Sequence, residues 1–284
     1  MMNLSFKLIP MLNYLRKSSK LLLAALALVI ALPIFQVSAE KTPPVDKLVE
    51  FAIQNYGGRP GIFTIQKNGI VKNNLKLING DNIREGRTVT KFIRKPKSLE
   101  DLVILELDLP ETKFTMGFDG AKSWATNNGE KAELSPELTS AFRTSYTHGY
   151  EALLRYKEDE GKIEFVETKK LASLEIDVID LTSVDGSKTR FEVSRRTGRV
   201  LQLEYETKGV DGNPTKYRLL FQDFKIVQNA VVIPYKTVVY ENGTKVEERT
   251  IVEAAYGVQL EEKIFKPDAP VTVEAKEEET PAKP

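Results

Sequence analysis

The sequence contains no cysteine, and this absence excludes several kinds of site at once. Without a thiol the chain forms no disulfide, offers no thiolate nucleophile and holds no cysteine-ligated zinc. Its single histidine, His148, excludes a two-histidine zinc site and would have to serve any serine triad alone. His148 stands in TSYTHGYEA, between two expected helical segments, where an ordinary loop histidine is the common case. We therefore predict no catalytic residue, no metal site, no cofactor and no enzymatic activity.

An excess of either charge is also lacking. The chain has 41 Lys and Arg residues against 40 Asp and Glu residues, and no basic face is evident. Nucleic-acid-binding proteins normally carry a basic patch or stripe, so we expect no nucleic-acid partner. The length of 284 residues and the hydrophobic content of 41% allow one large domain or two small ones.

The longest apolar run lies near the N-terminus. Basic residues precede the run LLLAALALVIALPIF, and the small residues of VSA close it at Ala39. This order is typical of a signal peptide, so we predict one over residues 1–39, with cleavage after Ala39 and secretion of the mature chain. An uncleaved anchor is the alternative, and Pro33 argues against it. Met1 and Met11 both fit as the start.

The C-terminal end, residues 267–284, is rich in proline, glutamate, alanine and lysine. Such a composition buries too little apolar surface to offset the entropy lost on ordering, so we predict a disordered tail. Its KEEET stretch is interpreted as a solvated charge run rather than a metal site. Between signal peptide and tail, we expect residues 40–266 to form a single domain.

An amphipathic helix is expected where this domain begins. Apolar residues recur there at i, i+3, i+4, i+7, i+8 and i+11, which places them on one helix face. Thr42 before Pro43 suits an N-cap and first turn, and Gly57 with Gly58 suits the end of the helix. The apolar stripe consists of Val45, Leu48, Val49, Ala52, Ile53 and Tyr56.

Beyond this helix the apolar period changes to two residues, which is typical of strands. Runs such as DLVILELDL, RVLQLEYET and KYRLLFQDF are separated by turn signals, among them Asn128-Gly129 and Asn242-Gly243. The pattern predicts an antiparallel meander of about 10–12 strands, interrupted once by helices after Ser135 and Gly149. A sheet of this length should curl into a barrel, a half-barrel or a sandwich.

Four features of this domain occur in a fixed order. A helix ending in glycines, LVEFAIQNYGG, leads into IFTIQKNG; a hairpin precedes tryptophan in FDGAKSW; helices interrupt the strands; and a closing run from FQDFKIVQNAVVIPY ends in IFKP. In this order they resemble the periplasmic outer-membrane lipoprotein-sorting proteins of the LolA-like superfamily. The likeness covers about Val45 to Pro267, and it departs from the usual glycine turn at Asn229-Ala230.

The resemblance implies a mainly β (α+β) fold, in which an incomplete antiparallel β-barrel has a few helices across its open mouth. It also implies a soluble periplasmic carrier that binds acyl chains of a lipid or lipoprotein in an apolar cavity for transfer toward the outer membrane. Donor and acceptor proteins in the two membranes would be its partners, and we expect a monomer. Burying an acyl chain is favourable by about 0.8 kcal/mol per methylene, so few polar contacts are needed.

We expect apolar side chains of the alternating strands to line this cavity and the helix stripe Val45–Tyr56 to form its lid. Aromatic residues and methionine suit such a lining. The expected lining residues are Phe92, Phe114, Met116, Phe118, Trp124, Leu201, Leu203, Tyr205, Leu219 and Phe221.

Plainer alternatives stay open. Trp124 is otherwise an ordinary core residue, and the helix stripe is otherwise core packing. Arg94, in an apolar strand, either bonds a lid carbonyl or points to solvent. The alternatives to a carrier are a lipid- or envelope-stress-sensing or regulatory domain of the same fold, and a packed structural envelope protein. The volume left inside the barrel distinguishes the packed protein from a carrier.

Overall fold

The computed structural model describes residues 44–208 and 213–266. The predicted signal peptide, residues 1–39, and the predicted tail, residues 267–284, lie outside the described residues. The helices of the described part are α1 (Val45–Asn55), α2 (Gly58–Phe63), α3 (Pro136–Thr147) and α4 (Tyr150–Leu154), with short 3-10 helices η1 (Ile65–Lys67), η2 (Ser98–Glu100) and η3 (Glu262–Phe265).

A single antiparallel sheet makes up most of the described residues. It has 13 strands, one more than the upper end of the expected range, in the order β6-β5-β4-β3-β2-β1-β13-β12-β11-β10-β9-β8-β7. The strands are β1 (Asn68–Asn79), β2 (Asn82–Ile93), β3 (Leu102–Leu109), β4 (Thr112–Phe118), β5 (Ser123–Asn127), β6 (Glu130–Ala132), β7 (Lys162–Leu171), β8 (Leu174–Thr182), β9 (Lys188–Ser194), β10 (Val200–Lys208), β11 (Pro214–Val227), β12 (Val231–Glu241) and β13 (Thr244–Tyr256).

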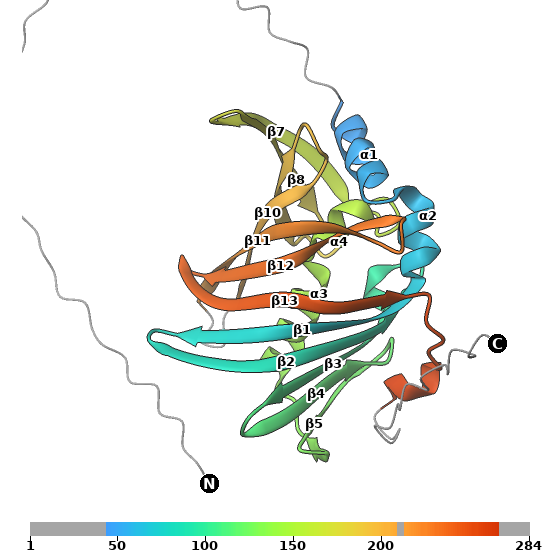
Figure 1. The fold of residues 1–284 in the computed structure, drawn as a ribbon, viewed down its shortest axis with the longest axis vertical. Helices are drawn as coiled ribbons and strands as arrows, with labels where there is room; N and C mark the ends of the chain where they lie inside the picture. The colour runs from blue at the N-terminus through green and yellow to red at the C-terminus, as the bar shows by residue number, and fades with distance from the viewer. Residues whose placement is uncertain (1–43, 209–212, 267–284) are drawn as a thin grey trace, which may run out of the picture. The chain divides into compact units, whose positions relative to one another are not determined.

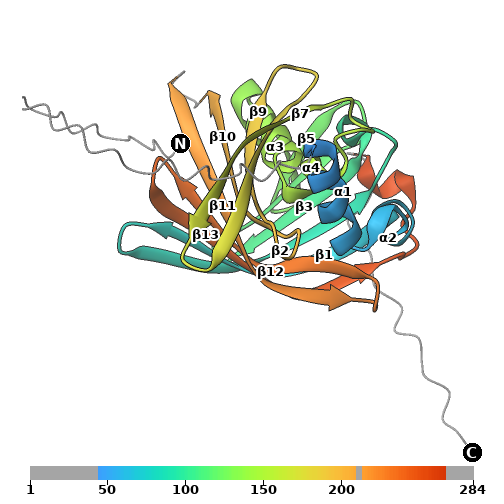
Figure 2. The same cartoon turned by 90° about the horizontal axis from the view of Figure 1, so that it is seen from above.

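The sheet is a meander with one long-range pairing. β1 pairs with β13, so the first and last strands lie side by side in the middle of the sheet, and β6 and β7 form its two edges. The sheet curls without closing, and the chain crosses from one edge to the other through α3 and α4 (Figure 1). Figure 2 shows α3 and α4 within the curve of the sheet, and α4 packs against α1. The predicted incomplete barrel is confirmed.

Local sequence signals explain several element ends. The Ser135 hydroxyl accepts a hydrogen bond from the Leu138 amide at 3.2 Å, and Pro136 occupies the first turn of α3, as expected for a capped helix. α1 begins at Val45 with Pro44 as its cap, later than the expected cap at Thr42, and ends before Gly57, whose φ of 111° suits glycine.

Hairpin turns set the register of the sheet. Asn242 and Gly243 both have positive φ, 48° and 85°, and join Glu241 to Thr244 as a two-residue hairpin loop requires. At the turn where glycine is absent, Gln228 and Asn229 take the left-handed conformation instead, with φ of 50° and 53°. That turn pairs Val227 with Val231 and continues the ladder between β11 and β12.

The hydrophobic core forms three clusters. The first joins α1 and α4 to strands β8–β12, and the second joins α3 to β2–β5 and to β12 and β13. Register places the strand residues of both on the concave face, because cross-strand partners such as Phe92 and Val103, or Leu203 and Leu219, share a face. The third cluster lies on the opposite face, where η3 inserts the fully buried Phe265.

Candidate functional site

A cavity of about 200 Å³ lies on the concave face, between the sheet and the helices α3 and α4. Strands β1, β2, β12 and β13 supply its floor, so it sits where the two halves of the meander meet. Aromatic and aliphatic residues make up nine of the fifteen lining residues, and polar or charged residues make up the other six. The lining residues are Val71, Asn73, Thr90, Phe92, Arg94, Tyr146, Tyr150, Glu151, Ile233, Pro234, Tyr235, Thr237, Arg249, Ile251 and Tyr256.

Two aromatic rings meet on the cavity floor above a glycine. The rings of Phe92 and Tyr256 have centroids 6.3 Å apart, and both strands that carry these residues pair with Gly69. A Cβ atom at Gly69 would stand 2.8 Å from Cδ1 of Tyr256 and 2.9 Å from Cζ of Phe92. Glycine is therefore required at this position for the two rings to fold across the strand.

The roof of the cavity comes from Tyr146 at the end of α3 and from Tyr150 and Glu151 at the start of α4. The Tyr150 ring stacks on Tyr56 with centroids 5.3 Å apart and meets the Phe221 ring edge-on at 5.6 Å. Aromatic pairs of this geometry add stability beyond the area they bury. Tyr150 therefore connects the cavity roof to the first core cluster.

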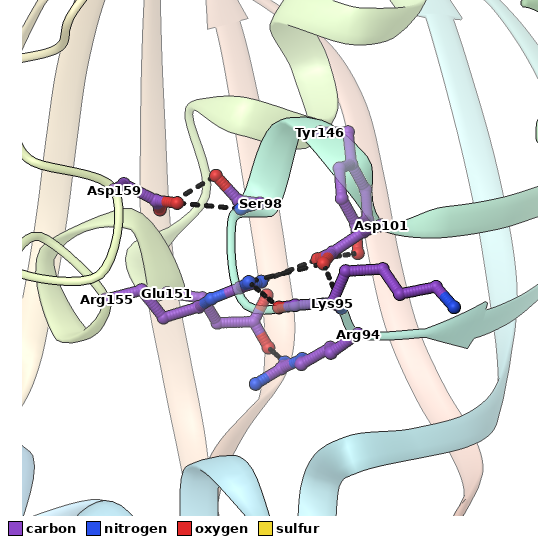
Figure 3. Close-up of polar contacts among 8 residues, drawn as sticks. All are labelled: Arg94, Lys95, Ser98, Asp101, Tyr146, Glu151, Arg155 and Asp159. Atoms are coloured by element: carbon purple, nitrogen blue, oxygen red, sulfur yellow. Dashed lines mark hydrogen bonds and ion pairs between the residues drawn. The ribbon is translucent and has the colours of Figure 1, made fainter. Parts of the chain in front are cut away.

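Buried ionic contacts tie this roof to the segment after β2 (Figure 3). Arg155 donates to both carboxylate oxygens of Asp101, at 2.5 and 3.2 Å, and to the Lys95 carbonyl at 2.8 Å. The Tyr146 hydroxyl donates to Asp101 at 3.1 Å, and the Lys95 amide does so at 2.7 Å. Burial raises the pKa of Asp101, although the Arg155 hydrogen bond opposes that rise. We call Asp101, Arg155 and Tyr146 the roof latch.

A second ionic contact closes the cavity end. Arg94 forms an ion pair with Glu151, and its guanidinium lies 5.3 Å from the centroid of the Phe92 ring. Burial is the largest single effect on Arg94 and disfavours its charge, but Glu151, Tyr146, Tyr150 and Asp101 together outweigh it, so the pKa of Arg94 is raised. Its partner in the roof is thus a carboxylate on α4, whereas the sequence suggested a lid carbonyl or solvent.

Most of the expected lining residues share the concave face. Phe92 belongs to both the cavity and the second cluster, where Met116 and Phe118 are buried and Phe114 packs beside them. The expected residues of β10 and β11 belong instead to the first cluster, against α1. These are Leu203, Tyr205, Leu219 and Phe221. One expected lining residue, Phe92, thus contacts the cavity itself, and seven others, all except Trp124 and Leu201, pack in the two concave clusters around it.

Trp124 lies on the opposite face of the sheet, so it does not line this cavity. It pairs with Gly117, and its indole Nε1 donates to the Phe265 carbonyl at 2.7 Å beneath η3. Leu201 is also outside the concave clusters, because the ladder between β9 and β10 shifts register between Val200 and Gln202. Alternation counted from Leu201 therefore fails at this bulge.

The expected lid helix is α1, and its stripe is packed into the first cluster. Val49, Ala52 and Ile53 are fully buried, Tyr56 is nearly so, and Val45 and Leu48 pack at the margin. The Tyr56 hydroxyl also accepts a hydrogen bond from the Val200 amide at 3.1 Å. Moving α1 away from the sheet would expose these buried side chains, so its packing opposes a lid movement.

Several lining residues were missed by the sequence analysis. Tyr146 and Tyr150 belong to the helical interruption of the strands, for which no lining residue was predicted. Ile233 and Tyr235 follow a two-residue alternation in β12, which predicts a shared face, whereas Ile251 and Tyr256 of β13 lie five positions apart and reach one face through the register shift opposite Lys72 and Asn73. Their convergence with β1 depends on the long-range pairing of β1 with β13, which no local pattern indicates.

Other kinds of site receive no support among the described residues. In that part of the chain, no group of three or more histidine, cysteine or acidic side chains is arranged to hold a metal ion. The helices of residues 44–208 and 213–266 include none that is both long and apolar enough to cross a membrane.

The fold is shared with solved structures of low sequence identity. One is an outer membrane lipoprotein-sorting protein domain from Vibrio parahaemolyticus, with a TM-score of 0.54 and 14% identity over 78% of this chain and 97% of that one. Another is a LolA superfamily protein from Nitrosomonas europaea, with a TM-score of 0.53 and 13% identity over 80% and 99%.

A third similar structure is a DUF1329 family protein from Desulfovibrio piger, with a TM-score of 0.54 and 14% identity over 80% of this chain and 98% of that one. No protein-family model matches the chain, and no curated protein matches it in sequence. At these identities the comparisons establish a LolA-like fold, which leaves the function to be argued from the cavity.

Proposed function

We propose that the protein is a soluble periplasmic carrier that holds an acyl chain of a lipid or lipoprotein against the concave face of its sheet. The observation that carries this proposal is the aromatic cavity at the junction of β1 and β13, roofed by two short helices. A carrier needs a mainly apolar wall and no nucleophile. The lipoprotein-sorting and LolA names of proteins with the same fold support it.

The size of the cavity indicates that cargo enters through an opened form. Its volume of about 200 Å³ is below the roughly 300–1,000 Å³ of usual small-molecule pockets. A chain of ten or more carbons needs more room, so the roof must lift before an acyl chain binds. Each buried methylene contributes about 0.8 kcal/mol, which offsets the free energy needed to separate the roof from the sheet.

We assign the lid to α3 rather than to α1 or α4, because α4 also packs fully buried side chains, Leu153 and Leu154, into the first cluster. Among the described side chains of α3, Phe142 is the buried hydrophobic one, whereas α1 buries several. A void of about 20 Å³ lies beneath α3, bordered by Val103, Phe118 and Phe142. A helix with few buried side chains and a void below it separates from the sheet at lower cost than a well-packed helix.

A packed structural envelope protein is the second candidate, because the two concave clusters already fill most of the interior. The two functions differ in ligand content. Native mass spectrometry of residues 40–284 purified from envelope extract, followed by lipid extraction, should find about one acyl species per chain. A bare mass, with no uptake of a fluorescent fatty-acid probe or of its methyl ester, would favour the packed protein.

The remaining parts of the proposal follow from a carrier's task. It would be secreted with the signal peptide of residues 1–39 and would work as a monomer. It would receive cargo from an inner-membrane donor and deliver it to an outer-membrane acceptor. Pull-down from envelope extract would identify these partners. The wild-type protein and a variant with a disrupted roof latch would serve as the two baits.

A further inference from the structure

Arg94, in the wall of the cavity, has N–H groups that donate to no protein acceptor. Its side chain is 5% exposed, and one terminal nitrogen, Nη2, is taken by Glu151. Within the described residues, Nε and Nη1 of Arg94 are buried and have no hydrogen-bond partner. Figure 3 shows the other terminal nitrogen directed away from Glu151. Buried donors without partners destabilise a protein, so their presence in a cavity wall indicates a place for an acceptor.

The charge at this wall is already balanced. Arg94 is paired with Glu151, Arg249, the other arginine of the lining, is paired with Glu247, and Arg155 in the roof is paired with Asp101. A carboxylate placed here would add an uncompensated negative charge beside Glu151, which is costly in a buried site. A neutral acceptor would satisfy the free N–H groups without that cost.

We propose that the cavity recognises the neutral carbonyl oxygen that joins an acyl chain to its head, as an ester or an amide, and that Nε and Nη1 of Arg94 donate to it. This inference rests on the proposed function and adds the identity of the polar group. The acyl chain then lies along Phe92, Tyr256 and Ile251, the apolar part of the same wall. Arg94 acts as the residue that selects linked acyl chains over free fatty acids.

The test compares four probes with the same saturated chain and different ends: a carboxylate, a methyl ester, an N-methyl amide and a methyl ether. Each competes with a fluorescent acyl probe for the protein without its signal peptide. The ester and amide should bind the wild-type protein at least about tenfold more tightly than the ether, as expected for hydrogen bonds from a charged donor.

Variants then assign the preference to Arg94. Arg94→Met should abolish the advantage of ester and amide over ether while leaving ether binding unchanged. Arg94→Lys retains the positive charge but not Nε and Nη1, and it should lose the same advantage. The matched control is Arg84→Met, which removes an exposed arginine paired with Glu111 far along β2. Thermal unfolding monitored by circular dichroism confirms that each variant folds.

The outcomes separate this inference from the proposed function. Ether binding equal to ester binding in the wild-type protein, tightest binding of the carboxylate, or an ester advantage that survives Arg94→Met would overturn the role of Arg94. In each of those cases the carrier function would stand. A folded wild-type protein that binds none of the four probes would overturn both.

Discussion

The carboxylate of Asp101 and the guanidinium of Arg155, 54 positions apart in the sequence, form a buried ion pair with Nη1 2.5 Å from Oδ2. The pair joins the segment after β2 to the C-terminal end of α4. Because Asp101 also accepts from Tyr146, the same carboxylate holds α3 as well. The roof of the cavity thus depends on one buried acidic side chain.

Breaking this pair should destabilise the protein strongly. Arg155→Met leaves the Asp101 carboxylate buried with an uncompensated charge, which costs about 3–5 kcal/mol. Urea unfolding measures the change in the free energy of unfolding. Arg190→Met, which removes the half-exposed pair with Asp180, should cost at most about 1 kcal/mol. A loss of about 1 kcal/mol or less in Arg155→Met would show that the roof latch contributes no more than an exposed ion pair.

The lid assignment predicts unequal hydrogen exchange in the helices. Amides of α3 should exchange faster than those of α1, because α1 buries Val49, Ala52 and Ile53 completely and α3 is held mainly through Phe142. Mass spectrometry of peptides covering the two helices gives both rates in one experiment. Exchange in α1 as fast as in α3 would restore α1 as the moving element.

His148 should make stability depend on pH. It is buried, hydrogen-bonds to the Thr189 hydroxyl at 2.6 Å and stacks on Tyr205. Burial lowers its pKa from 6.5 to about 4, against a smaller opposing effect of Asp185. Between these values the unfolded chain binds a proton that the folded protein excludes, so stability falls as the pH drops through this window, by about 3 kcal/mol.

Denaturant unfolding at neutral pH and near pH 4 checks this effect in wild type and His148→Gln. The variant should lose less stability between the two conditions, because glutamine does not titrate. Acidic groups other than Asp185, which interacts with His148, contribute equally to both proteins, so the difference reports His148 and its interaction with Asp185. Identical pH profiles would mean that His148 is protonated as easily in the folded protein as in the unfolded chain.

Gly117 should be needed for the packing of Trp124 on the face of the sheet opposite the cavity, and not for acyl binding. A Cβ there would stand 2.3 Å from Cε2 of Trp124, so Gly117→Ala should cost about 1–3 kcal/mol through overpacking. Tryptophan fluorescence should change, since Trp124 is the chain's single tryptophan. Acyl-probe affinity should stay the same, and a loss of affinity in a folded variant would link Trp124 to the cavity after all.

Local patterns were sufficient for elements whose stability is local. The stripe from Val45 to Tyr56, the cap at Ser135 and the hairpin at Asn242-Gly243 each depend on residues within a few positions of one another, and all are present. The length of the meander predicted that the sheet curls, and the resemblance to LolA-like proteins implied that the barrel is incomplete.

Features that depend on distant pairing were not predictable in the same way. Trp124 faces outward because β5 pairs with β4 in a register that puts it over Gly117. Leu201 lies outside the concave clusters because of a β-bulge, and no nearby residue indicates that bulge in the sequence. The roof latch unites Asp101 with Arg155, and each looks like an ordinary surface charge in the sequence.

The most direct test of the central claim compares acyl binding by two single variants, each with tryptophan at one of two adjacent positions. Ile251 lines the cavity, whereas its neighbour Val252 is 55% exposed. Titration with a fluorescent fatty-acid probe should show that Ile251→Trp fills the cavity and weakens binding by about tenfold or more, whereas Val252→Trp binds like the wild-type protein. Wild-type affinity in a folded Ile251→Trp variant would contradict a carrier that holds its cargo on this face.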